Sequence, residues 1–485
     1  MTTKSLLRAL LLLSATCGLL PYDAVASPYT AQTPVIDPSR ELMVIDHRVL
    51  DDARALGAGP WSFGTLMTRL AGSEDPAVFV EHWFDTLTQP QIVNGVSVFD
   101  VDKAFAFAQF RFQWQSASAA AEPEGPSLLM RLAPFRLLAI VNRPDLVKVG
   151  PNGITQYGEG RFVFGAYDIE SPSTVHNFFV IFEYGLPAES CADVLDWATR
   201  WHGLSAYAIE SESYRAALQA VTDSFTLPSV LTSKPNGSLL NQLRTNEFDL
   251  GDDFFWNLRE WNLVDHGTPD FATLDTVTTK QTPHFAYLNT TAGRTILQQY
   301  LDQNSVDILA GIHVVPDYFQ TTGFGVRSFQ SGDAENSCFH PQPHVVGLCN
   351  GAKGTRWWAP GYRGQPEEAP VSVVTADVRH KFALQTCSGC HFQETGTGFT
   401  MVSARQVGQE SQLSRFLTGL NYPINDAVIP NALDAGGTMV PVTHSFNDLQ
   451  ARAGKLVRML GLNCQIGSAL GELQTIQAEM GTRVH

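Results

Sequence analysis

The sequence predicts an α+β protein, in which a large mixed domain of antiparallel strands and packed helices precedes a mainly helical module. Three observations support this class. Short runs rich in aromatic and β-branched residues, bounded by turn residues, are typical of strands. Apolar residues at helical spacing follow them, and a second helical region comes after a long stretch rich in Gly and Pro. We therefore place the boundary between the α+β domain (27–370) and the helical module (371–485) at Pro370.

Residues 1–26 have the features of a cleavable signal peptide. Lys4 and Arg8 precede a mostly apolar run, and an Ala-Val-Ala sequence ending at Ala26 supplies the small-x-small cleavage pattern. The apolar run is shorter than the roughly 20 residues that a membrane-spanning helix needs. We therefore expect an exported protein, periplasmic or extracellular, that is not transmembrane.

Two further features bear on attachment to membranes and nucleic acids. Cys17 leaves a lipid anchor as an alternative, but Thr16 is a poor residue immediately before a lipidated cysteine. The chain carries 48 acidic and 32 basic residues, a formal net charge of −16. Because such a charge repels phosphates, nucleic acids and anionic membrane surfaces are not expected partners.

The large domain contains the strongest strand and helix signals. Residues 116–126, rich in Ala, Ser, Glu, Pro and Gly, read as a surface loop that could separate two subdomains. In chain order we then expect antiparallel strands at 135–141, 161–165 and 178–184, helices at 192–204 and 213–225, strands at 239–250 and 254–264, and a helix at about 292–309.

Two helices define the C-terminal module. Val374, Val378 and Phe382 recur every fourth residue in a helix that leads to a pair of cysteines, with Thr375 placed to cap its start. Residues 445–460 form a second amphipathic helix, with an apolar stripe from Phe446 to Leu460.

The cysteines fit an oxidising compartment. Of the seven in the sequence, six remain after Cys17 leaves with the signal peptide, and an even number suits disulfide pairing. We pair Cys338 with Cys349, because the Pro-rich loop between them would be rigidified by a bridge. Cys191 and Cys464 then pair by elimination.

The remaining two cysteines form the motif that carries chemistry, Cys387-Ser-Gly-Cys390-His391. Cys-x-x-Cys-His is the attachment sequence of c-type haem. Each thiol forms a thioether to a haem vinyl group, and the adjacent imidazole becomes the proximal ligand of the iron. The motif therefore predicts one covalent haem c bound by Cys387, Cys390 and His391.

Two other uses of the same residues were weighed. A thioredoxin-like redox pair would follow a strand, whereas the residues before Cys387 read as a helix. A zinc site could use both thiols with His391 and His380, but no second pair of ligands completes a known zinc-finger pattern. Haem attachment is therefore the favoured interpretation.

Residues 375–461 resemble the class I cytochrome c module, in which a helix leads into the haem motif, a methionine ligates the far side of the iron, and a closing helix follows. The resemblance assigns the distal ligand to Met439 and the closing helix to 445–460. The glycine and aromatic residue usual in the leading helix are missing. The stretch from Phe382 to His391 is also similar to exported bacterial proteins without assigned activity, which adds no function.

The distal ligand is open to other candidates. Met401 lies ten positions after His391, and at about 3.3 Å per extended residue that length of chain also reaches around a porphyrin. His444 and His380 are further candidates, and an open position would imply ligand binding instead. Met439 is the first choice and Met401 the alternative.

These features predict an exported haem protein that transfers electrons, alone or as the haem domain of an oxidoreductase. The redox partner protein is not identified by any motif. The alternative is a haem-free extracytoplasmic binding or structural protein, whose Cys387 and Cys390 form a disulfide or a zinc site.

Overall fold

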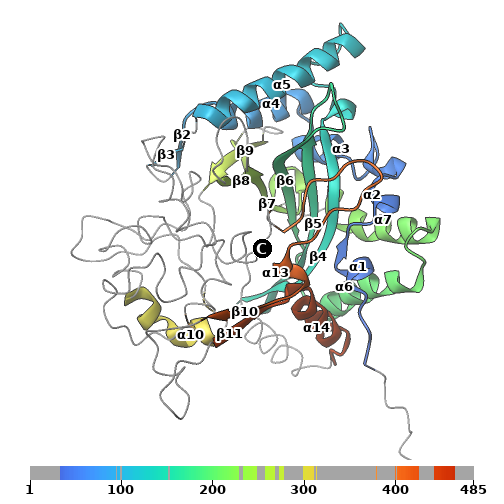
Figure 1. The fold of residues 1–485 in the computed structure, drawn as a ribbon, viewed down its shortest axis with the longest axis vertical. Coiled ribbons are helices and arrows are strands. Elements are labelled where there is room, and N and C mark those ends of the chain that lie inside the picture. Colours follow the sequence, from blue (N-terminus) through green and yellow to red (C-terminus); the bar gives the residue numbers. More distant parts are fainter. Residues whose placement is uncertain are drawn as a thin grey trace, which may run out of the picture. The chain divides into compact units, whose positions relative to one another are not determined.

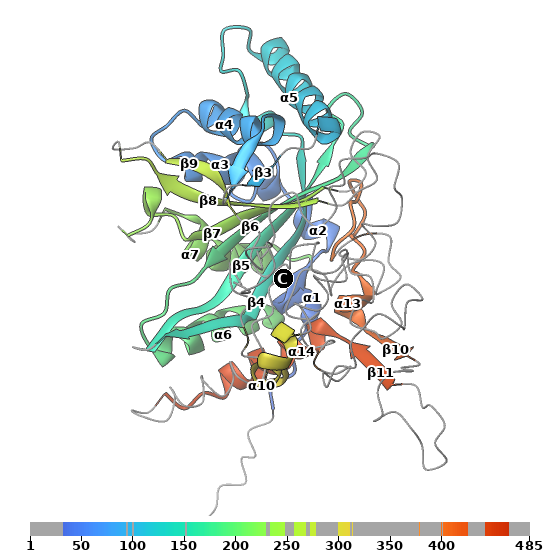
Figure 2. The ribbon, with the colours of Figure 1, turned by 90° about the vertical axis from the view of Figure 1, so that its left-hand side faces the viewer.

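The computed structural model describes residues 33–93, 96–98, 101–150, 153–228, 233–247, 257–267, 272–277, 299–310, 313, 378, 399, 401–424 and 442–464. The fold is built on a seven-stranded antiparallel sheet in the order β1-β4-β5-β6-β7-β8-β9, which Figures 1 and 2 show from two sides. Its strands are β1 (Met43–Val44), β4 (Phe135–Gly150), β5 (Gly153–Tyr167), β6 (Val175–Gly185), β7 (Leu240–Glu247), β8 (Asn257–Asp265) and β9 (Ala272–Val277). The predicted α+β class is confirmed at this level.

Helices cover one face of this sheet. Their starts are capped by side chains: Ser62, Asp75, Ser190 and Ser211 each accept a hydrogen bond from a backbone N–H of the first turn. The elements are α1 (Pro38–Glu41), α2 (His47–Leu50), α3 (Phe63–Ala71), α4 (Pro76–Thr88), α5 (Val101–Ala121), α6 (Cys191–Gly203) and α7 (Glu212–Thr226), with the short hairpin β2 (Gln91–Val93) and β3 (Val96–Val98) between α4 and α5.

The core between the helices and the sheet is aromatic. Because side chains alternate along a strand, Phe162 and Phe164 of β5 point to the same face as Phe182 of β6, and all three are fully buried. Phe63 of α3 stacks on Phe135 with ring centroids 4.0 Å apart. Burying one such ring stabilises the fold by roughly 1.5 to 3 kcal/mol.

Gly160 in β5 shows how closely this core is packed. A Cβ atom at this position would lie 2.4 Å from Cζ of Phe225 in α7, and real Cβ atoms do not come so near to a ring. The phenyl ring of Phe225 therefore rests directly on the backbone of the strand, which requires glycine there.

The C-terminal part of the chain lies against the other face. Residues 401–414 lead into α13 (Arg415–Thr418), and the hairpin β10 (Leu420–Ile424) and β11 (Val442–Phe446) precedes α14 (Asp448–Leu460). This last helix packs against β4 and α6, and a disulfide joins Cys464, just after it, to Cys191 at the start of α6. The predicted Cys191–Cys464 pairing is confirmed; Cys338 and Cys349 lie outside the described residues.

Arg405 fastens the same segment to the edge of the sheet. Its Nη2 and Nε donate to the carbonyl oxygen of Leu137 in β4, at 2.7 and 3.1 Å, and its Nη1 lies 2.8 Å from a carboxylate oxygen of Asp51. Arg136 returns a hydrogen bond of 2.8 Å to the carbonyl oxygen of Arg405. Contacts separated by more than 260 residues in sequence thus fix the C-terminal segment on the sheet.

Several expected elements are confirmed and some are wrong in detail. The strands expected at 135–141, 161–165 and 178–184 fall in β4, β5 and β6, and the helices at 192–204 and 213–225 correspond to α6 and α7. The strands expected at 239–250 and 254–264 overlap β7 and β8, and residues 248–250 and 254–256 lie outside the described ranges. The loop at 116–126 is wrong in its first half, because α5 continues to Ala121. The helix expected at 445–460 begins only at Asp448, since 442–446 form β11 and Asn447 caps the helix. The helix expected at 292–309 is present as a helical segment at 299–303 and as α10 (Ser305–Ala310), and its first residues lie outside the described ranges.

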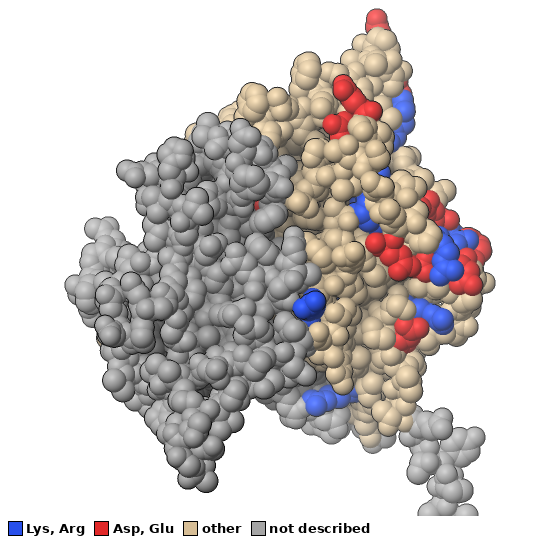
Figure 3. Space-filling model, viewed as in Figure 1, with Lys and Arg blue, Asp and Glu red and all other residues tan. Residues whose placement is uncertain are grey.

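The exposed charges of the described residues are intermixed. On the face that Figure 3 shows, acidic and basic side chains lie next to one another near α7. Arg200 and Asp196 of α6 are an exposed ion pair among the described residues, 2.8 Å apart. Among the described residues, no helix has the length and apolar character that crossing a bilayer requires.

Candidate functional site

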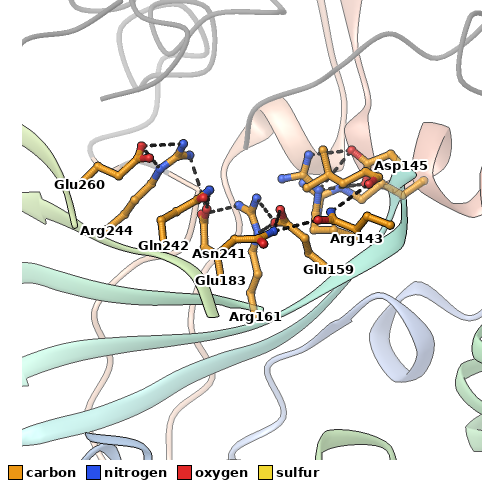
Figure 4. A network of polar contacts seen from close by, with 12 residues as sticks. Arg143, Asp145, Glu159, Arg161, Glu183, Asn241, Gln242, Arg244 and Glu260 are labelled. Carbon is orange, nitrogen blue, oxygen red and sulfur yellow. Dashed lines mark hydrogen bonds and ion pairs between the residues drawn. The ribbon is translucent and has the colours of Figure 1, made fainter. Parts of the chain in front are cut away.

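The second face of the sheet carries charged side chains where a core would ordinarily be apolar. The strand register places opposite charges directly across from one another: Arg143 of β4 faces Glu159 of β5, and Arg161 of β5 faces Glu183 of β6. Arg244 of β7 faces Glu260 of β8 in the same way. Figure 4 shows these side chains rising from the sheet on one side. Each of them is 6 % exposed or less.

The contacts within this row are short. Nη2 of Arg161 lies 2.7 Å from Oε2 of Glu159, and its Nη1 lies 2.8 Å from Oε1 of Glu183. Nη2 of Arg244 lies 2.9 Å from Oε2 of Glu260. The amide of Gln242 donates to Oε2 of Glu183 at 2.5 Å. Charge-assisted bonds of this kind are roughly twice as strong as neutral ones, so the row is firmly held in place.

Helix α14 closes one end of the row with charges of its own. Nη2 of Arg452 lies 2.5 Å from Oδ2 of Asp448, one turn earlier in the same helix. Asp145 of β4 accepts from Nη2 of Arg143 at 2.6 Å, and its backbone carbonyl accepts from Nζ of Lys455 at 3.5 Å. Strand and helix therefore share one buried ionic layer.

We call this set of ten side chains the ionic layer. It contains five cations and five carboxylates, so their charges balance. The members are Arg143, Arg161, Arg244, Arg452, Lys455, Asp145, Glu159, Glu183, Glu260 and Asp448.

Two members of the layer, Asp145 and Arg452, are held in their charged forms. Burial opposes the ionisation of Asp145, yet the charge and hydrogen bonds of Arg143 outweigh it and keep the pKa of this carboxyl well below its usual range. Burial, together with repulsion from Arg143, lowers the pKa of Arg452 to about 10. Both groups thus stay ionised at neutral pH.

A small pocket with a cavity volume of about 50 Å³ opens beside the ionic layer, and we call it the Met401 pocket. Twelve residues line it, of which eight are apolar, including Phe179, Ile181, Met401 and Leu417. The backbone of Met401 is fixed there, because its carbonyl oxygen accepts a hydrogen bond of 3.0 Å from the N–H of Ser414. Its partly buried side chain packs against the core.

Comparisons with protein-family models, curated proteins and solved structures return no match for this chain. Functional assignment therefore rests on its own residues.

Of the residues predicted to hold haem, the structure places only Met401, in the wall of the Met401 pocket. Cys387, Cys390, His391 and Met439 lie outside the described residues, as does His380. The backbone of His444 lies in β11, opposite Tyr422 of β10. The predicted proximal site is thus neither assembled nor contradicted by the described part of the chain.

One group of possible metal ligands occurs among the described residues, made of Asp46, His47 and Glu410. The carboxylate of Asp46 is already engaged by Arg48, whose Nη2 lies 2.6 Å from Oδ2 and whose Nε donates to Oδ1 at 3.0 Å. The guanidinium holds the pKa of Asp46 below its usual range. A cation there would have to displace Arg48, so this group is better explained as an ion pair at the start of α2.

Sequence reasoning missed the ionic layer. A signal for it exists in β5, where Glu159 and Arg161 occupy odd positions, on the opposite face of the strand from the aromatic residues Phe162 and Phe164. Charges two residues apart in a strand point to the same face, which is usually the solvated one. Here that face is covered, and only the structure shows it.

Proposed function

We propose that this protein is an exported c-type haem protein that transfers electrons, alone or as the haem domain of an oxidoreductase. The observation that carries the proposal is the sequence Cys387-Ser-Gly-Cys390-His391. It combines the two thiols that form thioethers with the imidazole that ligates the iron. When bound, the haem supplies the Fe(III)/Fe(II) couple, and the chain supplies attachment, an axial nitrogen and the surroundings.

The confirmed disulfide supports a location outside the cytoplasm. Cys191 and Cys464 are 273 positions apart, and their pairing ties the end of the chain to the middle of the sheet domain. Bonds of this kind persist in oxidising compartments and are rare in the cytosol. This agrees with the leader at 1–26, and a periplasmic or extracellular location is part of the proposal.

We further propose that residues 371–485 form a mainly helical haem module with α14 as its closing helix. Asp448, Arg452 and Lys455 of α14 are buried against the sheet domain, 3 % exposed or less. Removing these three charges from water without giving them ionic partners would cost free energy. The proposed module therefore folds onto the sheet domain and shares its ionic layer.

The first prediction is that haem stays bound to the chain after acid–acetone extraction, when the protein is matured with the cytochrome c assembly machinery. Replacing both Cys387 and Cys390 with serine should abolish this retention, because no thioether can form. The matched double variant Cys338→Ser with Cys349→Ser keeps the motif and should retain haem. Haem-free wild-type protein with bound zinc, or with a Cys387–Cys390 disulfide, would establish the alternative function instead.

A second prediction concerns the distal ligand, for which we propose Met439, with Met401 as the alternative. A thioether on the iron gives the oxidised protein a weak near-infrared sulfur-to-iron band and raises the potential relative to a second histidine. Met439→Ala should abolish the band and lower the potential, whereas Met401→Ala should change neither. Since Met401 packs against the core, its removal should lower the free energy of unfolding by about 2 to 3 kcal/mol.

Each other outcome of this experiment has a definite meaning. If Met401→Ala loses the band and Met439→Ala keeps it, Met401 is the distal ligand of the iron. A wild-type spectrum without the band would reject both methionines and leave His444, His380 or an open position.

A further inference from the structure

Helix α5 presents two large aromatic side chains to solvent. Phe105 is 67 % exposed and Phe112 is 68 % exposed. Because they are seven positions apart, about two helical turns, both rings lie on the same side of the helix. Figures 1 and 2 both show α5 at the outer edge of the described fold.

The rest of this side of the helix is uncharged. We call it the α5 face, and its exposed residues are Phe105, Ala108, Gln109, Phe112, Ser116, Ala119 and Ala120. In residues 104–121 the one charged residue is Arg111, whose Nη1 lies 2.7 Å from Oδ1 of Asp85 in α4. Single exposed apolar residues are ordinary, whereas a continuous apolar patch is typical of a surface that meets another molecule.

The core of the protein does not need these two rings. The opposite side of α5 is already packed, with Phe107, Phe110 and Trp114 buried. Nε1 of Trp114 donates to the carbonyl oxygen of Leu129 at 3.1 Å, which fixes the rotation of the helix about its axis. The α5 face therefore points away from the fold to which the helix belongs.

The pattern of the α5 face fits a second copy of itself. If two such helices pack antiparallel about a two-fold axis level with Ala108 and Gln109, Phe105 of each copy lies opposite Phe112 of the other. Ala108 then faces its own counterpart, and its small side chain allows the helix axes to approach to about 8 Å. A contact of this kind is complete with two copies.

Charge and area define the strength of such a contact. The chain has a formal net charge of −16, so two copies repel each other and can meet most easily through an uncharged face. Burying one phenylalanine removes about 150 to 250 Å² from water. Four rings, each two-thirds exposed beforehand, supply roughly half of the 1,200 Å² that the smaller stable interfaces bury. The expected dimer is therefore a weak one.

We propose that the α5 face is the interface of a weak homodimer, in which two copies of α5 pack antiparallel through Phe105 and Phe112. The occupant of the face is a second copy of this chain. The interface goes beyond the proposed electron transfer and does not depend on the haem motif.

Sedimentation velocity of the full-length mature protein, from about 1 μM to about 1 mM, covers the affinities of weak interfaces. We expect monomer at the lowest concentrations and dimer at the highest. The double variant Phe105→Glu/Phe112→Glu places four carboxylates in the contact and should raise the dissociation constant at least about tenfold. Val306→Glu/Leu309→Glu is the matched control, because it adds the same charge at two exposed apolar positions of α10. It should leave the dissociation constant unchanged.

Disulfide crosslinking tests the antiparallel arrangement. Ala108→Cys places two thiols beside the two-fold axis, within the Cα separation of about 7 Å that a disulfide permits. Ala119→Cys lies on the same face, but its two copies would be roughly 30 Å apart at 1.5 Å per residue. Mild oxidation should therefore crosslink Ala108→Cys as a dimer and leave Ala119→Cys at the background of wild-type protein treated in the same way.

The remaining outcomes would overturn the proposal. These are a monomer at every concentration, a dimer that Phe105→Glu/Phe112→Glu does not weaken, and equal crosslinking of Ala108→Cys and Ala119→Cys. Binding of the monomer to neutral phosphatidylcholine vesicles, lost in Phe105→Glu/Phe112→Glu, would assign the face to a lipid surface instead. Sedimentation can be measured on protein that attaches no haem, so failure of the haem proposal is distinguishable from failure of this one. Far-ultraviolet circular dichroism confirms that each variant is folded.

Discussion

Arg161→Met is expected to lower the free energy of unfolding by about 3 to 5 kcal/mol, a large part of the stability of an ordinary domain. The guanidinium lies within 2.8 Å of both Glu159 and Glu183, and its loss removes the nearest cation from two carboxylates that are 3 % exposed or less. A buried charge without its partner costs more than the pair itself contributes. Denaturant unfolding followed by fluorescence measures the change.

Two comparisons make this result specific to the ionic layer. Arg200→Met removes an exposed pair with Asp196 on α6 and should cost less than about 1 kcal/mol. Adding Glu159→Gln to Arg161→Met should recover part of the loss. If Arg161→Met and Arg200→Met lower the free energy of unfolding equally, the ionic layer contributes no more to stability than a surface ion pair.

Removing the disulfide should have a similar effect. The double variant Cys191→Ser with Cys464→Ser is expected to lose about 4 to 5 kcal/mol, because the bridge closes a loop of 273 residues in the unfolded chain. The loss should appear as a lower midpoint of denaturant unfolding, with a larger slope as the unfolded chain expands.

Reduction provides the control for this variant. Wild-type protein and the double variant should unfold at the same midpoint when both are treated with a thiol reductant, because the Cys191–Cys464 bridge is then absent from both. An unchanged midpoint in the double variant would mean that the packing of α14 on β4 and α6 is sufficient without the bridge.

The elements that could be predicted from the sequence are those whose signal is local. The strands β4 to β8 are rich in aromatic and β-branched residues, and α6 and α7 each bury one apolar stripe. Helix α5 was not predicted because it carries aromatic residues on its exposed side as well as its buried side: Phe107 and Phe110 are buried while Phe105 and Phe112 are exposed. Its last turns, rich in Ala and Ser, were misread as a loop although Ala favours helices.

Helix α14 shows a different limit. Its apolar residues predicted the helix, but its buried face also includes Asp448, Arg452 and Lys455, which a sequence pattern assigns to solvent. These charges are buried because their partners Arg143 and Asp145 lie on the sheet. The partnership depends on strand register and on contacts 300 residues apart, which no local pattern encodes.

The same distinction applies to the site. The haem motif consists of five consecutive residues and can be recognised from the sequence alone. The Met401 pocket, in contrast, is assembled from β1, β4, β5, β6, β7 and the C-terminal segment. Of the proposed iron ligands, Met401 is the one that the structure relates to that pocket. Its position beside Arg161 and Arg452 could not be inferred from its distance to His391 in sequence.

The ionic layer has a consequence for how the molecule is made. During synthesis the strands that carry Arg143 to Glu260 emerge long before Asp448, Arg452 and Lys455, so the charged side of the sheet remains hydrated in the growing chain. At β4, water leaves that side when the last helix packs against it and Cys464 pairs with Cys191. Contacts so distant in sequence form slowly. A chain truncated before α14 would therefore keep the charged side of its β4 strand exposed to water. It should be cleaved by proteases more readily than the full-length protein.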